Sequence, residues 1–507
     1  MARAAMVVLM LLLFAPLPLG AGAPEVAGAT PETARQAPGA QLFDPRRPPE
    51  AELQLGVGDG FTLAAVGDCI MSRPLSAMLK SDEAFAAIAR VVRETSATFG
   101  NLETSIVDVR TTRGDPEGGS DDWTLTADPG VVVDLKTLGF DLLSRANNHA
   151  LDWGIEGMRE TSRRLDEAGL VHAGVGENRA EARAARYLET EKGRIALVSM
   201  VSTFREYSAA LPPSGQAPGR PGVDALRTTR TTIVPEPVMR ALRDLKATLD
   251  AGLVKCEGKP SGPPELAMKP FEAPLKPQEL SLFDMRFRPG ERAGYHYDID
   301  PQDLAEILKA IRAGKQHSDF LIATIHAHET GVECEEPGDF LPVLAHASID
   351  AGASAFLVHG SHYLGPIEIY KGRLVAYGLG NFFWSDIQEP QPANLYEQNR
   401  DLLKSAFGDP SKATDADMNA LLNATSFNDE LFFQSIVVVS RYDGGRLSEV
   451  RLYPVDLGYG MRLTKSGVPR LAAAPVARTI LDRLQRLSQP YGTAIAIEKG
   501  VGVIRPR

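Results

Sequence analysis

The sequence predicts an α/β fold in which most strands are parallel. From Phe61 onward, short runs rich in β-branched residues alternate with helical patterns, as in parallel sheets that are covered by helices. The 507 residues are 44% hydrophobic and 23% charged, a composition that supports a large buried core. Because no linker inside the core is convincing, we predict one large domain with insertions.

Seven apolar segments are expected to form the strands of this core. They are Phe61 to Val66, Ala97 to Phe99, Phe140 to Ser144, Ile195 to Ser199, Phe320 to Ile325, Ala355 to Val358 and Leu374 to Tyr377. Apolar residues recur at the spacing of one helix face from Leu304 to Ile311 and again from Leu341, which predicts two helices on the sheet. Val437 to Tyr453 alternates as a strand pair around a glycine turn. A helix from Ala477 to Leu487 and a short strand near Ile495 are expected to close the chain.

Three stretches interrupt the alternation. Leu211 to Gly222 and Cys256 to Pro289 are dense in proline and glycine, which predicts surface excursions or a flap. Glu389 to Asn428 is polar and is interpreted as a second lid.

The N-terminus has the layout of a secretory signal. Arg3 precedes an apolar run from Val7 to Phe14, and the small residues Gly20 to Ala23 offer a cleavage site. An uncleaved anchor is the alternative, but prolines interrupt the run before the roughly 20 apolar residues that a membrane span needs. The mature protein is therefore expected outside the cytoplasm, in the periplasm or cell envelope. The expected division of the chain is a signal at residues 1–23, a flexible stalk at 24–55, the main domain at 56–460 and a helix and strand extension at 461–507.

Charge and cysteine content exclude several classes of function. A net charge of -11 argues against a nucleic-acid partner, because such proteins usually present a basic face to the phosphates. Cys69, Cys256 and Cys334 form no CxxC pair, so a disulfide framework and a structural zinc site are both improbable. Cys69 is interpreted as a buried structural thiol rather than a nucleophile, since no histidine partner is evident.

Polar residues follow almost every predicted strand, at the sheet edge where α/β proteins place their ligands. They are Asp68, Glu103, Asn147, Asn148, His149, Asp152, His326, His328, Glu329, His359 and His362. Any one of them has a simpler explanation, such as an aspartate that caps a turn or a packed histidine. Together they form a mixed set of oxygen and nitrogen ligands that suits Mn, Fe, Zn or Mg. The sequence therefore predicts a metal centre.

Six segments also resemble a known family. They are LAAVGDCIMSRPL, FGNLETSIVD, LLSRANNHALDWGIEGM, IHAHE, HGSHYLGPIEIYKG and YGLGNFFW. The resemblance is to the CapA-type proteins of bacterial poly-γ-glutamate capsule synthesis, and it covers roughly Phe61 to Trp384, continuing weakly to Tyr459. It implies a metallophosphatase-like layered α/β sandwich with Pro-rich insertions, and residues 56–460 would form the CapA-like domain.

The resemblance also assigns roles to individual residues. The positions that match expected metal ligands are Asp68, Glu103, Asn148, His326 and His362. His149 matches a histidine that assists the leaving group in phosphatase relatives, and Asp152 would orient it. Three expected features are absent. Many members carry HWG where this chain has His326-Ala327-His328, and many carry a histidine where it has Gly360. The DxH pattern that opens metallophosphatase sites is also absent at Asp68, which is followed by Cys69 and Ile70. The number of ions, one or two, stays open, and so does the participation of the neighbouring His328 and His359.

Three functions agree with these observations. The first is an exported metal-dependent hydrolase that acts on an amide or phosphoester of poly-γ-glutamate or a related envelope polymer. The second is a non-catalytic component that binds the anionic polymer during capsule assembly, with capsule synthesis membrane proteins as possible partners. The third is a metal-dependent peptide epimerase.

Overall fold

The computed structural model describes residues 56–116, 124–252, 255–256, 259–260, 273–385, 387–391, 393–425 and 428–506. These residues belong to one compact unit, Glu50–Arg507. The signal segment and the stalk that the sequence predicts, residues 1–55, lie outside the described residues. Within the described ranges, no helix is both long enough and apolar enough to span a bilayer.

The first of two large sheets has ten strands. Its parallel part consists of β1 (Phe61–Met71), β2 (Ala97–Leu102), β5 (Leu142–Ser144), β6 (Val171–Ala173) and β21 (Asn381–Ser385). Its antiparallel part consists of β22 (Gln434–Asp443), β23 (Arg446–Asp456), β24 (Arg470–Leu471), β25 (Ala496–Glu498) and β26 (Val501–Ile504). The predicted strand pair Val437 to Tyr453 lies in β22 and β23. The sheet is thus mixed. Its parallel half contains β1, β2 and β5, the strands for which the sequence analysis found polar residues at the carboxyl end.

The second sheet has six strands. They are β8 (Arg186–Thr190), β9 (Gly193–Val201), β17 (Phe320–Ala327), β18 (Ala355–Gly360), β19 (Ile367–Tyr370) and β20 (Arg373–Ala376). The four central strands are parallel, and the register pairs Ile322 with both Ala355 and Leu197. The edge strands β8 and β19 are antiparallel to their neighbours.

The two sheets pack face to face, and alternation along β1 explains how. Leu63 and Ala65 belong to the same apolar cluster as Leu197 and Ile322 of the second sheet, whereas Ala64 and Val66, which alternate with them, belong to a different cluster. Successive side chains of a strand point to opposite faces, so one face of β1 fills the centre of the sandwich. The predicted layered α/β sandwich is confirmed.

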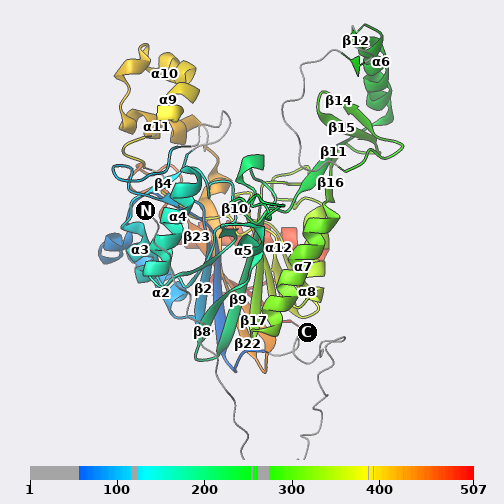
Figure 1. The fold of residues 1–507 in the computed structure, drawn as a ribbon. Coiled ribbons are helices and arrows are strands. Elements are labelled where there is room, and N and C mark those ends of the chain that lie inside the picture. Colours follow the sequence, from blue (N-terminus) through cyan, green and yellow to red (C-terminus); the bar gives the residue numbers. More distant parts are fainter. Residues whose placement is uncertain are drawn as a thin grey trace, which may run out of the picture. The chain divides into compact units, whose positions relative to one another are not determined.

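Helices cover the outer faces of the sandwich (Figure 1). The first sheet is covered by α2 (Glu83–Arg93), α3 (Val131–Leu138) and α4 (Gly154–Glu167), and the second by α7 (Pro301–Gln316) and α8 (Phe340–Asp350). α12 (Ala474–Ser488) packs on β23 and β19. The start of α7 follows from its sequence, because the Asp300 carboxylate accepts hydrogen bonds from the N–H groups of Gln302 and Asp303 and Pro301 needs no partner for its nitrogen.

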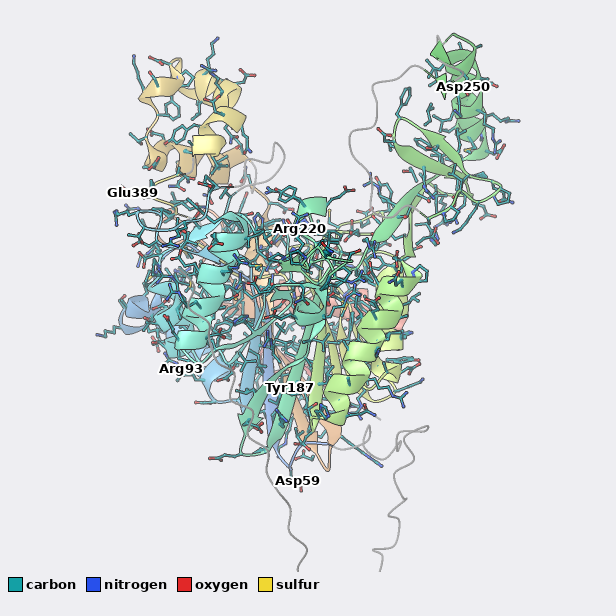
Figure 2. All side chains as sticks on the ribbon, viewed as in Figure 1. Asp59, Arg93, Tyr187, Arg220, Asp250 and Glu389 are labelled. Atoms are coloured by element: carbon teal, nitrogen blue, oxygen red, sulfur yellow. The ribbon has the colours of Figure 1, made fainter. Side chains whose placement is uncertain are left out.

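The Pro-rich and polar insertions form elements of their own. A four-stranded sheet contains β11 (Thr228–Val234), β14 (Leu280–Leu282), β15 (Met285–Pro289) and β16 (Gly294–Ile299), next to α6 (Glu236–Gly252). The predicted second lid contains α9 (Ala393–Gln398), α10 (Arg400–Phe407) and α11 (Asp415–Thr425). Figure 2 marks Asp250 in α6 and Glu389 before α9. The remaining short elements are β3 (Ser105–Ile106), β4 (Thr126–Ala127), α5 (Arg179–Arg183), β7 (Val175–Gly176), β10 (Gly222–Val223), β12 (Lys255–Cys256) and β13 (Lys259–Pro260).

The first strand differs from its prediction in a way that affects the site. The sequence places its end at Val66, but β1 continues to Met71 because its second half pairs with β21. The register between β1 and β2 shifts between Ala65 and Asp68. Gly67 permits this bend, since a Cβ there would lie 1.8 Å from the carbonyl oxygen of Gly380. Asp68 therefore lies within a strand, at an irregularity that redirects its side chain.

Candidate metal centre

Six carboxylate and imidazole side chains meet at the carboxyl ends of the parallel strands. β1 and the residue directly after β2 in the first sheet supply two carboxylates, whereas β17, β18 and the segments after them supply four histidines. The side chains fall into two groups of three, and within each group the ligand atoms all lie within 4.8 Å of one another. The first group contains Asp68, His326 and His359, and the second contains Glu103, His328 and His362.

The first group is fully buried. The Nδ1 atoms of His326 and His359 lie 3.1 Å apart, and His359 Nδ1 lies 3.6 Å from Asp68 Oδ1. Two ring nitrogens at this distance require either a proton between them or a cation that both coordinate. The carboxylate beside them favours a cation.

The second group adjoins the first. His326 Nε2 lies 3.0 Å from His328 Nε2 and 3.5 Å from Glu103 Oε1. His362 lies near both carboxylates, with Nδ1 3.3 Å from Asp68 Oδ2 and Nε2 3.9 Å from Glu103 Oε1. His326 and His362 thus approach members of both groups through their two ring nitrogens.

Two asparagines and a backbone N–H group hold the carboxylates in place. Asn101 Nδ2 donates a hydrogen bond to Asp68 Oδ1 at 2.8 Å and lies 3.3 Å from His326 Nδ1. Asn147 Nδ2 donates to Asn101 Oδ1 at 3.1 Å, which fixes the orientation of that amide. The Gly360 N–H donates to Asp68 Oδ2 at 3.1 Å. Such outer contacts orient metal ligands and tune their basicity.

His149 and Asp152 form a separate buried pair beside the two groups. His149 Nδ1 lies 2.7 Å from Asp152 Oδ2, and the same oxygen accepts a hydrogen bond from the Leu125 N–H at 2.6 Å. The His149 N–H donates to Asn147 Oδ1 at 3.2 Å, which links the pair to the network around Asp68. The role of Asp152 in orienting His149 stays a prediction, and this geometry agrees with it.

Aromatic rings enclose His362. Its ring centroid lies 5.3 Å from that of Trp384 and 5.0 Å from that of Phe432. His362 Nδ1 lies 2.9 Å from Asn381 Oδ1, and Asn381 Nδ2 donates to the Phe432 carbonyl at 3.1 Å. The residue has a φ of 62°, an uncommon value for a side chain other than glycine. Packing and hydrogen bonding compensate for this strained backbone.

The protonation states favour metal binding. Burial alone would raise the pKa of Asp68, but the hydrogen bond and charge of His362 and the charge of His359 lower it to about 2. Burial lowers the pKa of His359 to about 4, and burial and the neighbouring His362 lower the pKa of His328 to about 3. Burial also places the pKa of His326 well below its usual value. An ionised carboxylate and neutral imidazoles are the forms that coordinate metals.

The donor set fits a divalent cation with mixed oxygen and nitrogen ligands. Two carboxylates and four imidazoles suit Mn, Fe or Zn, whereas Mg, which the sequence also allowed, prefers oxygen ligands alone. The buried His359 Nε2 and Asn148 Oδ1 have no hydrogen-bond partner among the described residues. Cys69 lies next to Asp68 but belongs to neither group, and its buried thiol is 3.7 Å from the Gly67 carbonyl. Burial, and then Asp68 and Glu103, raise the pKa of that thiol well above its usual value, which agrees with a structural thiol.

The backbone at Gly360 requires a residue without a side chain. Gly360 has a φ of 107°, and a Cβ there would lie 2.9 Å from the Ala327 nitrogen and 3.0 Å from His326 Cε1. No side chain fits this position without moving the first group. His359, one residue earlier, places its imidazole against Asp68 instead.

Four of the five ligands that the sequence predicts lie in the two groups. They are Asp68, Glu103, His326 and His362. The fifth, Asn148, stays a prediction. Its side chain is buried, and its Oδ1 has no hydrogen-bond partner among the described residues. His328 and His359, whose participation the sequence leaves open, complete the groups.

Sequence reasoning assigned no role to Asn101 or Asn381. The sequence does contain a signal for Asn101. Residues two apart in a strand lie on the same face of the sheet, and Asn101 precedes the predicted ligand Glu103 by two residues. Asn381 stands in the segment YGLGNFFW, and its importance follows only from the pairing of β21 with β1.

Comparison with known proteins supplies the family. A family model described as bacterial capsule synthesis protein PGA_cap matches residues 62–385. The chain belongs to this family. This match confirms the family membership that the sequence motifs predict. The matched residues, 62–385, contain all six side chains of the two ligand groups.

Several curated proteins are similar to this PGA_cap family member. An uncharacterized protein of Sinorhizobium fredii, y4sH, is 44% identical over 89% of this chain and 94% of its own length. The capsule biosynthesis protein CapA of Bacillus anthracis is 22% identical over 63% of this chain and 59% of its own length. A probable polyglutamine synthesis accessory protein of Mycobacterium tuberculosis is 25% identical over 50% of this chain and 47% of its own length.

Proposed function

We propose that this protein acts in the synthesis or processing of a poly-γ-glutamate type of envelope polymer, as a metal-dependent hydrolase of an amide or phosphoester. Family membership and the names of the CapA relatives support the capsule role. The observation that carries the hydrolase assignment is the buried His149 and Asp152 pair next to two groups of metal-type ligands.

The six side chains of the two groups are the residues that would hold the metal. A bound divalent cation lowers the pKa of a coordinated water and polarises a carbonyl or phosphoryl oxygen. Asn101 and the Gly360 N–H keep the Asp68 carboxylate oriented toward the histidines. The aromatic rings of Trp384 and Phe432 exclude water from one side of His362.

His149 is proposed to move the proton. Its Nδ1 faces Asp152, which fixes Nδ1–H as a donor and leaves Nε2 to exchange a proton with the substrate. Burial raises the pKa of Asp152, and the neighbouring His149 opposes that shift. Asp152 thus favours the imidazolium form that develops when Nε2 accepts a proton.

The test is the substitution His149→Asn. It removes the proton carrier but keeps a small polar side chain, so metal content and melting temperature should change little. Cleavage of γ-glutamyl oligomers and complementation of a deletion strain should fall by about 10²–10⁴ in rate. His346→Asn is the matched control, because His346 lies on α8 against Glu368 and Tyr370.

The alternative functions give different results in the same experiment. Full complementation by His149→Asn with metal retained would support the non-catalytic polymer-binding component. Inversion of the configuration at the α-carbon of a glutamyl residue, without cleavage of the oligomer, would support the peptide epimerase.

Export and membrane partners are part of this proposal. A capsule polymer is assembled at the envelope, so we propose that residues 1–23 direct the chain there and that the folded part contacts membrane proteins of polymer synthesis. Sequencing the N-terminus of the mature protein tests the first point. A start near Pro24 supports export with cleavage, and an intact Met1 on membrane-bound protein indicates an anchor.

A further inference from the structure

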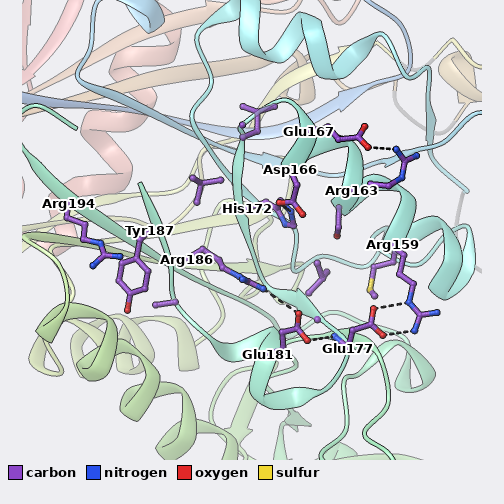
Figure 3. A pocket seen from close by; sticks show the side chains of 18 residues that line it. Arg159, Arg163, Asp166, Glu167, His172, Glu177, Glu181, Arg186, Tyr187 and Arg194 are labelled. Carbon is purple, nitrogen blue, oxygen red and sulfur yellow. Dashed lines mark hydrogen bonds and ion pairs between the residues drawn. The ribbon is translucent and has the colours of Figure 1, made fainter. Parts of the chain in front are cut away.

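The charged side chains of a cleft beside α4 are paired with one another. Arg159 forms two hydrogen bonds with Glu177, at 2.8 and 2.5 Å, and Arg163 lies 2.7 Å from Glu167 (Figure 3). Carboxylates that lose contact with water usually have a cationic partner of this kind. A partly buried carboxylate without such a partner therefore needs another explanation.

Glu329 is a carboxylate without such a partner, and it directly follows His328 of the second group. Its Oε2 accepts hydrogen bonds from two hydroxyl groups, Ser202 Oγ at 2.7 Å and Thr203 Oγ1 at 2.8 Å. Among the residues that the structure describes, no Lys, Arg or His side chain pairs with it. The two hydroxyl groups therefore take the place of a cation.

Both hydroxyl groups lie just beyond β9, where the ladder between β9 and β17 stops. The last pair of that ladder joins Val201 to His326, and the Ser202 N–H donates to the His326 carbonyl at 3.0 Å. His328 lies beyond this last pair. Its backbone is therefore not fixed by a partner strand.

Thr203 supplies the contact that the ladder no longer provides. Its Oγ1 accepts a hydrogen bond from the His328 N–H at 2.8 Å and donates its own proton to Glu329 Oε2. A hydroxyl group has one proton, so donation to Glu329 leaves the oxygen lone pairs for the His328 N–H. Glu329 therefore orients Thr203, and Thr203 holds the backbone of His328.

The position of His328 matters because its ring belongs to the second group. His328 Nε2 lies 3.0 Å from His326 Nε2, and its ring centroid lies 5.4 Å from that of His362. Ligands form a working site only when they are held to within about 0.5 Å of the required geometry. His326 is held by the ladder of β17, whereas His328 depends on the contact with Thr203.

We propose that Glu329 and Thr203 are positioning residues of the metal centre, and that they set the metal affinity of the second group by holding His328. Hydrogen bonds carry this role, so it does not require a charge on Glu329. The inference rests on the metal centre of the proposed function, but not on hydrolysis or on the identity of the substrate.

The experiment is a titration of the full-length protein with cobalt(II) after treatment with a chelator. Calorimetry gives the affinity and the number of ions, and the visible absorption of cobalt(II) reports the geometry of its ligands. His328→Gln is the reference variant. The ion whose binding it weakens is the ion that the other variants are expected to affect.

The variants of Thr203 test the hydroxyl group. Thr203→Val keeps the shape of the side chain and removes the hydroxyl, so affinity for this ion should fall about 10–100-fold and its absorption should change. Thr203→Ser keeps the hydroxyl and should retain most of the affinity.

The variants of Glu329 test the same role from the other side of the hydrogen bond. Glu329→Ala removes the acceptor of Thr203, so it should weaken the same ion as Thr203→Val does. Glu329→Gln should recover most of the affinity, because its amide oxygen accepts the same hydrogen bonds.

Thr324→Val is the matched control. Thr324 is a buried residue of β17, and its Oγ1 donates to the Leu357 carbonyl at 2.8 Å. The substitution removes one buried hydrogen bond outside the two groups. It should lower the melting temperature about as much as Thr203→Val does, but leave the affinity and absorption of cobalt(II) unchanged.

Unchanged cobalt(II) affinity in folded Thr203→Val or Glu329→Ala would overturn the positioning role and leave the metal centre standing. An equal loss in Thr203→Ser, or in Thr324→Val, would also overturn it, because the loss would then reflect packing rather than the hydroxyl group. A wild type that binds no metal would overturn the metal centre as well. The measurement uses no substrate, so failure of the hydrolase assignment alone does not affect it.

Discussion

The Nε2 atoms of His326 and His328 lie 3.0 Å apart, although the two residues belong to different groups of metal-type ligands. His326 is the penultimate residue of β17, and His328 lies just beyond the end of the strand, so the strand delivers both rings to the same edge. The contact joins the two groups into one continuous site.

The first prediction concerns the number of metal ions. Because each group offers three ligands, we expect two divalent ions in the wild type. His359→Gln removes a ligand of the first group and His328→Gln one of the second, so each variant should retain about one ion. Elemental analysis of purified protein measures this, with His346→Gln as a control that keeps both ions. Loss of all metal in either variant would indicate a single shared site.

The second prediction concerns Gly360. Gly360→Ala forces a Cβ against the Ala327 nitrogen and His326 at a φ of 107°, so unfolding free energy should fall by about 2–3 kcal/mol and metal affinity should also fall. Gly372→Ala is the matched control. Gly372 has a φ of 72°, but a Cβ at this position would have no atom within 4 Å. Gly372→Ala should therefore lower the unfolding free energy by only about 1 kcal/mol and leave metal binding unchanged. Denaturant unfolding and metal titration distinguish the two.

The third prediction concerns Asn381, which accepts a hydrogen bond from His362 Nδ1. Asn381→Ala should lower metal affinity about 10–100-fold, because the imidazole loses the contact that orients it. Asn381→Asp restores the acceptor and should recover part of the affinity. Asn423→Ala, which removes a contact within α11, should have no effect on metal. Unchanged affinity in Asn381→Ala would exclude a positioning role.

The fourth prediction concerns the thiols. Burial and the neighbouring carboxylates keep Cys69 protonated, so iodoacetamide should not modify it in the native protein, whereas the exposed Cys334 should react. Peptide mass spectrometry gives the extent of labelling at each position. Cys69→Ala should retain activity. Loss of activity in a folded variant would contradict the structural interpretation.

The fifth prediction concerns the ion pairs at the start of α7. Asp303 accepts hydrogen bonds from Arg183 and Arg227, each at 2.6 Å. Burial alone would raise its pKa, but the hydrogen bonds from Arg227 and then Arg183 hold the pKa below the usual value. A lowered pKa stabilises the fold above the unfolded-state pKa of about 3.9, and this contribution is lost as the pH falls through the folded-state pKa.

Asp303→Asn should therefore cost about 1–3 kcal/mol at pH 7, because both arginines lose one charged acceptor, while Arg183 keeps Asp224 and Glu306 as partners. The difference from wild type should shrink as the pH approaches 3. Asp350→Asn, which breaks the exposed pair with Lys371, should change stability little at either pH. Chemical unfolding as a function of pH measures both variants, and a difference that grows in acid would contradict the assignment.

Local sequence patterns are sufficient to predict the layers of the fold and most residues of the site. Strands such as Phe320–Ala327 and helices such as Pro301–Gln316 are evident from their periodicity, because burial on one face imposes a regular spacing of apolar residues. The carboxyl ends of parallel strands meet at one edge, so Asp68, Glu103 and His326 could be predicted to lie together.

The distribution of these residues between two groups depends on long-range packing, which no local pattern predicts. The pairing of β1 with β21 carries Asp68 past the predicted strand end and brings Asn381 to His362 from a distant part of the chain. His359 lies against Asp68, and the burial of Arg145 depends on the approach of α4 and β6. Local sequence patterns specify the periodicity of an element, but strand register, close backbone approach and long-range contacts arise only when the elements pack.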